Sequence, residues 1–170
     1  VVPCGVDLSF FKPCEDQSKI DEVRKKFNIN GDYFLYLGTL EPRKNLEMLI
    51  ESYKLFLDKC EDKANAPKLV LAGGRGWLFD SIFEKVKSEN LSEQVLFTEY
   101  LASADRVPLM CGSLAFCFPS IYEGFGMPPL EAMACGVPVL TSNAASLPEV
   151  VGESAVICDP YSKESICDGL

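Results

Sequence analysis

Residues 113–142, SLAFCFPSIYEGFGMPPLEAMACGVPVLTS, contain a complete strand–loop–helix–strand unit. Residues 113–120 form a short apolar run that predicts a buried strand. Pro128 and Pro129 suit the first turn of a helix, because proline lacks the N–H that would be unpaired there. Residues 136–142 return to a strand pattern. Two strands joined through a helix favour a parallel pair with a right-handed crossover.

The same alternation continues outward along the chain. Further strands are predicted at 33–38, 68–74, 94–101 and 154–160, and further helices at 46–57, 77–89, 104–110 and 146–150. Asn45 is a plausible N-cap for the first of these helices. Strands that are apolar on both faces belong in a parallel sheet covered on both sides. The pattern therefore predicts an α/β fold, a doubly wound, Rossmann-like parallel sheet of about six strands with helices on both faces.

Composition narrows the class of protein. The chain of 170 residues fits a single domain, 1–170, and its net charge of −9 argues against a broad nucleic-acid surface. The absence of histidine excludes Ser-His-Asp catalysis within these residues. The eight cysteines form no C-x-x-C pair, which favours buried thiols in a reducing cytosol. No signal peptide is visible, and no apolar run approaches the ~20 residues of a membrane span.

The loop TLEPRKN, residues 39–45, places Arg43 and Lys44 between a strand and the start of a helix. A helix N-terminus is already positive, so two cations there make sense if an anion such as a diphosphate sits above the loop. The alternative is a solvated basic pair held by Glu41 or Glu47. This loop alone does not decide between the two.

Glu123 and Glu131 are eight positions apart, on either side of two glycines and a Pro-Pro pair. Glu131 is expected in the first helical turn, where a favourable dipole interaction would also explain it. Glu123 could be an ordinary loop acid. Two carboxylates opposite an Arg-Lys pair would instead frame a ligand with hydroxyls at its ends and phosphates in its middle, which is the shape of a sugar nucleotide. Gly126 would allow such a ligand to approach the backbone closely. Gly126→Val is therefore expected to block binding of the ligand without unfolding the domain.

The blocks YLGTLEPRKNLEMLI, LVLAGGRGWL, VLFTEYLASADRVPLM and PSIYEGFGMPPLEAMACGVPVLTS together resemble the carboxy-terminal half of a retaining family 4 glycosyltransferase of the GT-B fold. The E-x7-E motif from Glu123 to Glu131 is the most specific part. The resemblance implies one half of a GT-B enzyme, with the amino-terminal acceptor domain and the terminal helices outside these residues. A fragment of this kind is expected to be inactive alone.

The resemblance also implies a role for each site residue. Glu131 would hold the ribose hydroxyls, and Glu123 would contact the donor sugar near the reacting carbon. Arg43 and Lys44 would neutralise the diphosphate. The remaining donor contacts would come from backbone N–H groups at Gly124, Phe125 and Gly126, and from a base-binding loop with Tyr100 and Leu101.

The implied function is transfer of a hexose from a nucleoside-diphosphate sugar to a saccharide or lipid-linked acceptor, with retention of configuration and without metal or cofactor. EPRKN with GGRGWL favours mannose and GDP-mannose. The acceptor, and peripheral contact with the inner face of the cytoplasmic membrane, would belong to the missing half of a cytoplasmic enzyme. Two alternatives remain open: a sugar-nucleotide epimerase or phosphorylase of related fold, and an inactive nucleotide-sugar-binding module.

Overall fold

A computed structural model describes residues 4–77, 79–99 and 101–170 of the chain. In it, six parallel strands form one sheet in the order β3-β2-β1-β4-β5-β6. The strands are β1 (Tyr33–Leu37), β2 (Lys68–Ala72), β3 (Val95–Thr98), β4 (Ala115–Phe118), β5 (Val139–Ser142) and β6 (Val156–Cys158). This order confirms the doubly wound, Rossmann-like sheet predicted from the alternating pattern.

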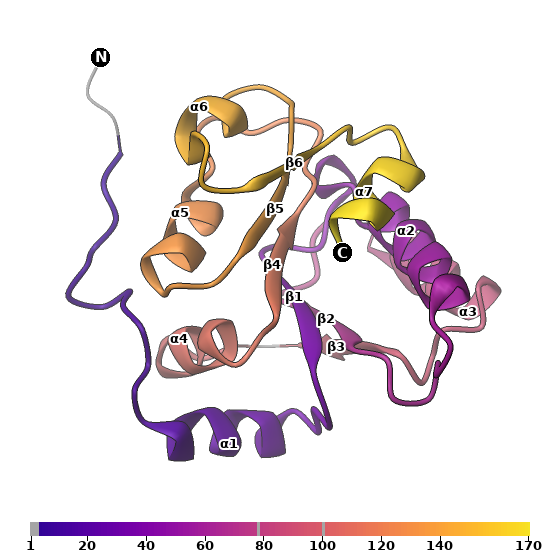
Figure 1. Ribbon diagram of the computed structural model, residues 1–170, viewed down its shortest axis with the longest axis horizontal. Helices are drawn as coiled ribbons and strands as arrows, with labels where there is room; N and C mark the ends of the chain where they lie inside the picture. Colours follow the sequence, from indigo (N-terminus) through magenta and orange to yellow (C-terminus); the bar gives the residue numbers. More distant parts are fainter. Residues whose placement is uncertain (1–3, 78, 100) are drawn as a thin grey trace.

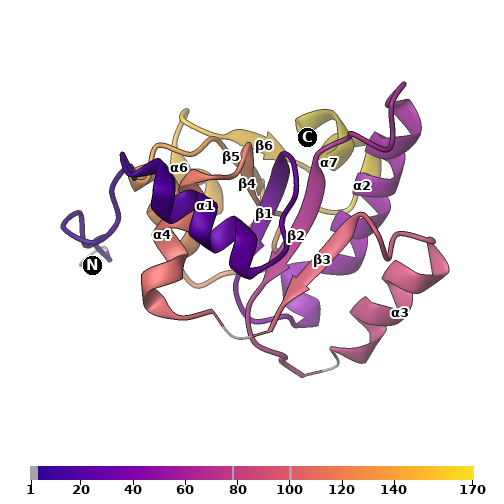
Figure 2. The ribbon, with the colours of Figure 1, turned by 90° about the horizontal axis from the view of Figure 1, so that it is seen from below.

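Helices cover both faces of the sheet, as Figures 1 and 2 show. On one face lie α1 (Gln17–Lys26), α4 (Ser103–Cys111), α5 (Met127–Ala134) and α6 (Leu147–Val151). On the other lie α2 (Leu46–Lys59), α3 (Asp80–Ser88) and α7 (Lys163–Gly169). A single turn of 3-10 helix, η1 (Pro42–Lys44), precedes α2.

The central strands are buried because both of their faces meet helices. All five residues of β1 and all four of β5 are buried. Tyr33 lies at the base of this core, where its hydroxyl donates to the Leu109 carbonyl at 2.7 Å. The edge strand β6 departs from the prediction of strands buried on both faces, since Val156 and Ile157 are exposed. β6 pairs only with β5, so one edge of this strand has no neighbouring strand in the sheet.

The cysteine prediction is correct for half of the set. Cys117, Cys135, Cys158 and Cys167 are buried, whereas Cys14, Cys60 and Cys111 are half-buried and Cys4 is exposed; all eight thiols are free. The buried ones act as small apolar side chains in the core.

One prediction about helix starts holds for position only, and another is wrong. Asn45 is the N-cap residue of α2 as predicted, but its backbone is left-handed (φ +62°) and its side chain makes no capping bond. Glu131 is the fifth residue of α5, because that helix already begins at Met127. A dipole interaction in the first turn therefore does not explain Glu131. Helix α1 has no counterpart among the predicted elements: only Ile20 and Val23 are buried along it, so its apolar stripe is thin.

Candidate active site

The site lies where the strand order reverses. The chain passes from β1 outward to β2 and β3, then returns to build β4 on the other side of β1. The loops that follow β1 and β4 therefore leave neighbouring strands and lead to helices on opposite faces of the sheet, which is where open sheets of this kind form a crevice for a ligand. These loops carry Arg43 and Lys44 on one side and Glu123 on the other. Their backbones are joined where Ile121 N–H donates to the Arg43 carbonyl at 3.0 Å.

Side-chain hydrogen bonds hold the two loops in place. The Asn45 amide donates to the carbonyls of Pro119 (3.1 Å) and Pro160 (2.7 Å), tying the β1 loop to the segments that follow β4 and β6. The Ser146 hydroxyl donates to the Phe125 carbonyl at 2.8 Å and to that of Glu123 at 3.2 Å. Ser146, the residue that precedes α6, thus holds the loop around Glu123 in place.

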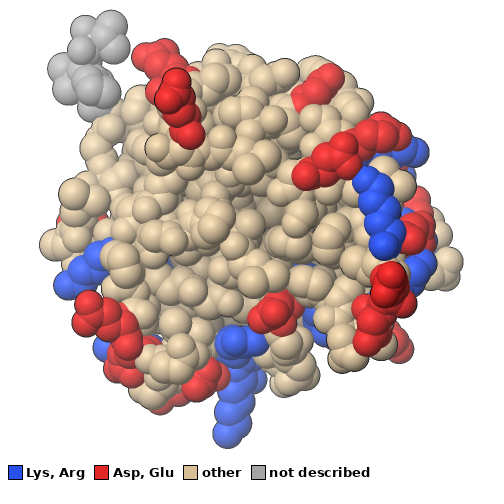
Figure 3. Space-filling view, in the orientation of Figure 1, with Lys and Arg blue, Asp and Glu red and all other residues tan. Residues whose placement is uncertain are grey.

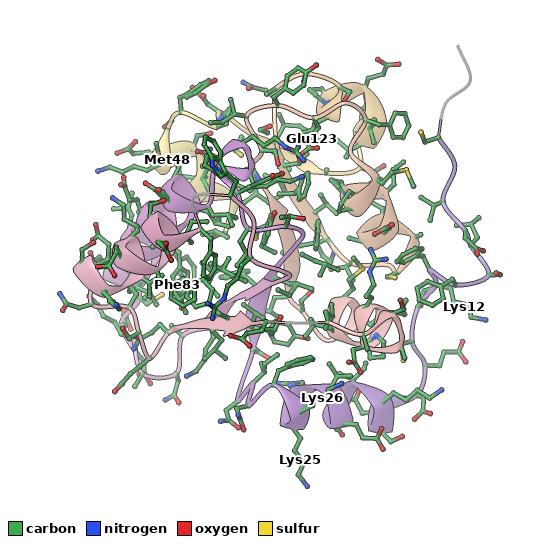
Figure 4. The ribbon with its side chains drawn as sticks, turned by 180° about the vertical axis from the view of Figure 1, so that it is seen from behind. Lys12, Lys25, Lys26, Met48, Phe83 and Glu123 are labelled. Atoms are coloured by element: carbon green, nitrogen blue, oxygen red, sulfur yellow. The ribbon has the colours of Figure 1, made fainter. Side chains whose placement is uncertain are left out.

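Glu123 accepts from both cations at once. Lys44 Nζ lies 2.6 Å from its Oε1, and Arg43 Nη1 lies 2.9 Å from its Oε2. Arg43 also pairs with Glu41 at 2.7 Å. The side chains of Lys44 and Glu123 are 8% and 10% exposed, whereas that of Arg43 is 48% exposed. Figure 4 shows Glu123 beside the loop that precedes α2. The alternative of a solvated basic pair is therefore correct for Arg43, which pairs with Glu41, and wrong for Lys44, which is buried. Glu47 holds neither cation and instead accepts a hydrogen bond from Ser81.

The electrostatics of this cluster keep Glu123 ionised. Burial by itself would raise the pKa of the Glu123 carboxyl. The hydrogen bond and charge of Lys44 outweigh that effect, with help from Arg43, and hold its pKa below the usual value. Lys44 is fixed in turn by the face of Phe118, whose ring centroid is 4.7 Å from Nζ. The cluster thus presents a fixed carboxylate with one buried and one accessible cation.

Glu131 has its own cation, which the sequence prediction missed. Arg106, from α4, donates through Nη2 to Glu131 Oε2 at 2.7 Å. Burial raises the pKa of the Glu131 carboxyl, and the Arg106 charge only partly opposes this. Arg106 carried no signal in the sequence, because its partner is 25 residues away on another helix.

The glycines between the two acids play different parts. A Cβ at Gly124 would meet no atom within 4 Å, so the loop is open there. Gly126 has φ +107°, and a Cβ there would lie 2.7 Å from Leu147 Cδ2. That Gly126→Val spares the fold stays a prediction, but the structure adds a cost in stability, because the new side chain would strain the backbone and press on Leu147 between α5 and α6. Among the described residues, none accepts a hydrogen bond from the N–H groups of Gly124, Phe125 or Gly126.

A cavity of about 300 Å³ adjoins this crevice. Its lining residues are Leu37, Gly38, Gly73, Gly74, Leu101, Arg106 and Pro128. Leu101, predicted to help seat a base, thus lies in the same cavity wall as Arg106. Tyr100, its predicted companion, lies outside the described residues.

Charge is dispersed over the face of the molecule that Figure 3 shows. On the face shown in Figure 3, acidic and basic side chains lie around the rim without a broad basic area. Within the described ranges, no group of three or more Cys, Asp or Glu side chains is placed to hold a metal ion. No helix in the described part of the chain is long and apolar enough to cross a bilayer.

The strand order defines a doubly wound α/β domain, and domains of this class bind their ligands at the switch point, which lies here between β1 and β4. Residues 19–170 match the family described as "Glycosyl transferases group 1". The chain belongs to this family, which confirms the resemblance found in the sequence.

Individual relatives agree with this assignment. O-antigen chain mannosyltransferase B of Escherichia coli is 42% identical over 134 residues, which cover 79% of this chain and 34% of the relative. The chain thus spans about a third of that relative's length. The C-terminal domain of a glycosyl transferase group 1 family protein (LpcC) from Francisella tularensis superposes with a TM-score of 0.78 at 26% identity, covering 96% of this chain and 85% of that one.

A third comparison shows the fold alone. The structure of Anabaena Alr3699/HepE in complex with UDP-glucose superposes with a TM-score of 0.80 at 21% identity, covering 96% of this chain and 44% of that chain. This chain therefore has the fold of one half of a GT-B glycosyltransferase.

Proposed function

We propose that this chain is the donor-binding half of a glycosyltransferase that moves a hexose, with mannose favoured, from a nucleoside diphosphate to an acceptor hydroxyl. The observation that carries the proposal is the convergence of Arg43, Lys44 and Glu123 at the switch point of the sheet. These side chains come from two loops that follow neighbouring strands, and a diphosphate with a sugar at one end would meet both a cation and a carboxylate there.

The reaction places charge where the cations lie. The bond between the anomeric carbon and the diphosphate oxygen breaks, and the diphosphate leaves with the electron pair. The acceptor oxygen bonds to the same face of that carbon and passes its proton to the leaving diphosphate oxygen, so the configuration is retained. Fixed positive groups stabilise the leaving diphosphate more than the intact donor, each by on the order of 3 kcal/mol, so they lower the barrier.

Arg43 and Lys44 have different roles in this proposal. Arg43 is accessible, and its exposed pair with Glu41 is worth at most about 1 kcal/mol, so a phosphate can replace that carboxylate at little cost. Lys44 is buried against Glu123 and fixes its position at the sugar end of the crevice. The unbonded N–H groups of Gly124, Phe125 and Gly126 are available for donor oxygens.

The remaining donor contacts would be made at Glu131 and in the cavity lined by its partner Arg106. There Glu131 would accept from the ribose hydroxyls, and the loop with Leu101 and Tyr100 would seat the base. GDP-mannose is the favoured donor, and the 42% identical relative named as a mannosyltransferase supports mannose. A saccharide or lipid-linked acceptor, and contact with the inner face of the cytoplasmic membrane, would depend on the other half of a cytoplasmic enzyme.

Calorimetric titration of the chain with GDP, UDP and ADP, without added metal, tests the proposal. One nucleotide is expected to bind, and Arg43→Ala with Lys44→Ala is expected to abolish that binding. Lys54→Ala is the matched control, because Lys54 forms an exposed pair with Asp58 within α2, away from the crevice.

The full-length enzyme then decides the function. Glu123→Ala is expected to remove sugar transfer from GDP-mannose while the protein stays folded. Transfer at the normal rate in that variant would refute the role given to Glu123. A full-length protein that binds none of the three nucleotides at millimolar concentration would refute the donor-binding function itself.

A further inference from the structure

The Arg106 guanidinium is held beside Glu131 by two neighbouring side chains. Its guanidinium carbon lies 5.2 Å from the ring centroid of Phe11, a buried residue of the segment before α1. Its Nη2 lies 2.7 Å from Glu131 Oε2. An aromatic face on one side and a carboxylate on the other restrict the guanidinium to one orientation.

Arg106 lines the cavity of about 300 Å³, and Glu131 adjoins it through its bond to Arg106. Arg106 is the one charged residue among the described residues that line it; the others are apolar side chains and glycines. At Gly73 a Cβ would lie 2.0 Å from the Gly38 carbonyl oxygen, so bare backbone is required where β1 and β2 end. An apolar cavity with a single charged group suits the flat, uncharged end of a ligand next to a polar group.

Only one of the two Glu131 carboxylate oxygens accepts a hydrogen bond from a described residue. Oε2 is held by Arg106, and Oε1 accepts no hydrogen bond from any described residue. The side chain is nevertheless only 11% exposed. A largely buried carboxylate with one oxygen free has capacity for one strong hydrogen bond from a ligand hydroxyl.

We propose that Arg106 is a positioning residue for the nucleoside end of the donor: it fixes Glu131 Oε2 so that Oε1 accepts from a ribose hydroxyl. This inference rests on the proposed function. Arg106 acts through Glu131 and therefore sets the preference for ribose over deoxyribose, and it leaves the diphosphate end to Arg43. Its charge also lowers the cost of burying an ionised carboxylate there.

The test compares GDP, UDP and ADP with their 2′-deoxy forms by calorimetric titration of the full chain. The wild type is expected to bind the ribonucleotide roughly tenfold or more tightly than its deoxy form, as for one hydrogen bond to a charged group. Arg106→Met is expected to bring the ratio close to one, with affinity for the deoxy form nearly unchanged. Glu131→Gln should do the same, and the double variant should go no further.

Two more variants keep the test decisive. Arg106→Lys keeps the charge and should retain part of the ribose preference. Lys26→Met is the matched control. It removes the Lys26 Nζ that lies 2.5 Å from Asp105 Oδ2, on the same helix as Arg106, and it should leave the ratio as in the wild type. Thermal unfolding checks that each variant is folded, and if Arg106→Met is not, Arg106→Lys and Glu131→Gln carry the comparison.

The outcomes separate this inference from the proposed function. An unchanged ratio in Arg106→Met, or an equal loss of affinity for both nucleotide forms, overturns the positioning role and leaves the donor site intact. A wild type that binds ribose and deoxyribose forms equally also overturns it. A wild type that binds neither form, as the isolated chain and at full length, overturns the proposed function itself.

Discussion

Glu123 has the most hydrogen bonds to charged groups in the candidate site and a central role in the proposed reaction. It is nearly buried and yet ionised, because Lys44 and Arg43 both donate to it. Its folded pKa is below the usual value of 4.5, so the ionised form stabilises the folded state at pH values above 4.5. This contribution is lost as the pH falls through the folded pKa.

Glu123→Gln should therefore flatten the acid side of the stability curve. From about pH 5 to about pH 3, the free energy of unfolding is expected to fall more steeply in the wild type than in the variant. At neutral pH the variant should be less stable by roughly 3 kcal/mol, because Lys44 is left buried without its counter-ion. Urea unfolding followed by circular dichroism over this pH range measures both effects.

The control for this prediction is Glu84→Gln, which removes an exposed acid paired with Lys87 on α3. It should reproduce the wild-type pH dependence. Identical slopes for the wild type and Glu123→Gln would contradict the ion cluster as described.

At the scale of elements, the loop between β4 and α5 combines an open position with a closed one. Gly124 faces free space, whereas Gly126 has a positive φ and packs against Leu147 of α6. The two glycines look alike in the sequence. Their surroundings predict opposite consequences for an added methyl group.

Gly126→Ala should lower the free energy of unfolding by about 1–3 kcal/mol, because the left-handed backbone and the contact with Leu147 both oppose a Cβ. Gly124→Ala should leave stability within about 0.5 kcal/mol of the wild type. It should nevertheless weaken nucleotide-sugar binding if the donor approaches the backbone there. Chemical denaturation and donor titration of the same two variants distinguish these effects. A stable Gly126→Ala would argue against the α5–α6 packing.

Asn45 links three elements and offers a second prediction at this scale. Its φ of +62° suits asparagine or glycine, and its amide bridges the carbonyls of Pro119 and Pro160. Asn45→Gly should lose only the hydrogen bonds, at about 1–2 kcal/mol. Asn45→Ala should lose more, since it also strains the left-handed backbone. Equal stability of the two variants, measured by thermal unfolding, would show that the backbone conformation contributes nothing.

Across the whole molecule, the sheet is well covered except along β6. Val156 is 53% exposed on a strand that pairs only with β5. An apolar sheet edge is a surface on which copies of a chain can pair.

Val156→Lys should reduce self-association at high concentration and change the free energy of unfolding by less than about 0.5 kcal/mol. Light scattering against concentration measures this; Leu114→Lys, which adds the same charge at an exposed position before β4, should have a smaller effect. Equal scattering for the wild type and Val156→Lys would contradict it.

The sequence by itself determined the order and type of most elements, because apolar runs and helical periodicity are local properties. It also predicted that Arg43, Lys44 and Glu123 would meet, as the structure shows, since the loops that follow neighbouring parallel strands lie at one edge of the sheet. It did not reveal the pairing of Arg106 with Glu131, the two carbonyls bound by Asn45, or the contact of Gly126 with Leu147. Those interactions join segments that only the folded chain brings together. Tertiary structure alone also decided that Lys44 is buried and Arg43 exposed, because burial depends on the neighbours that packing supplies.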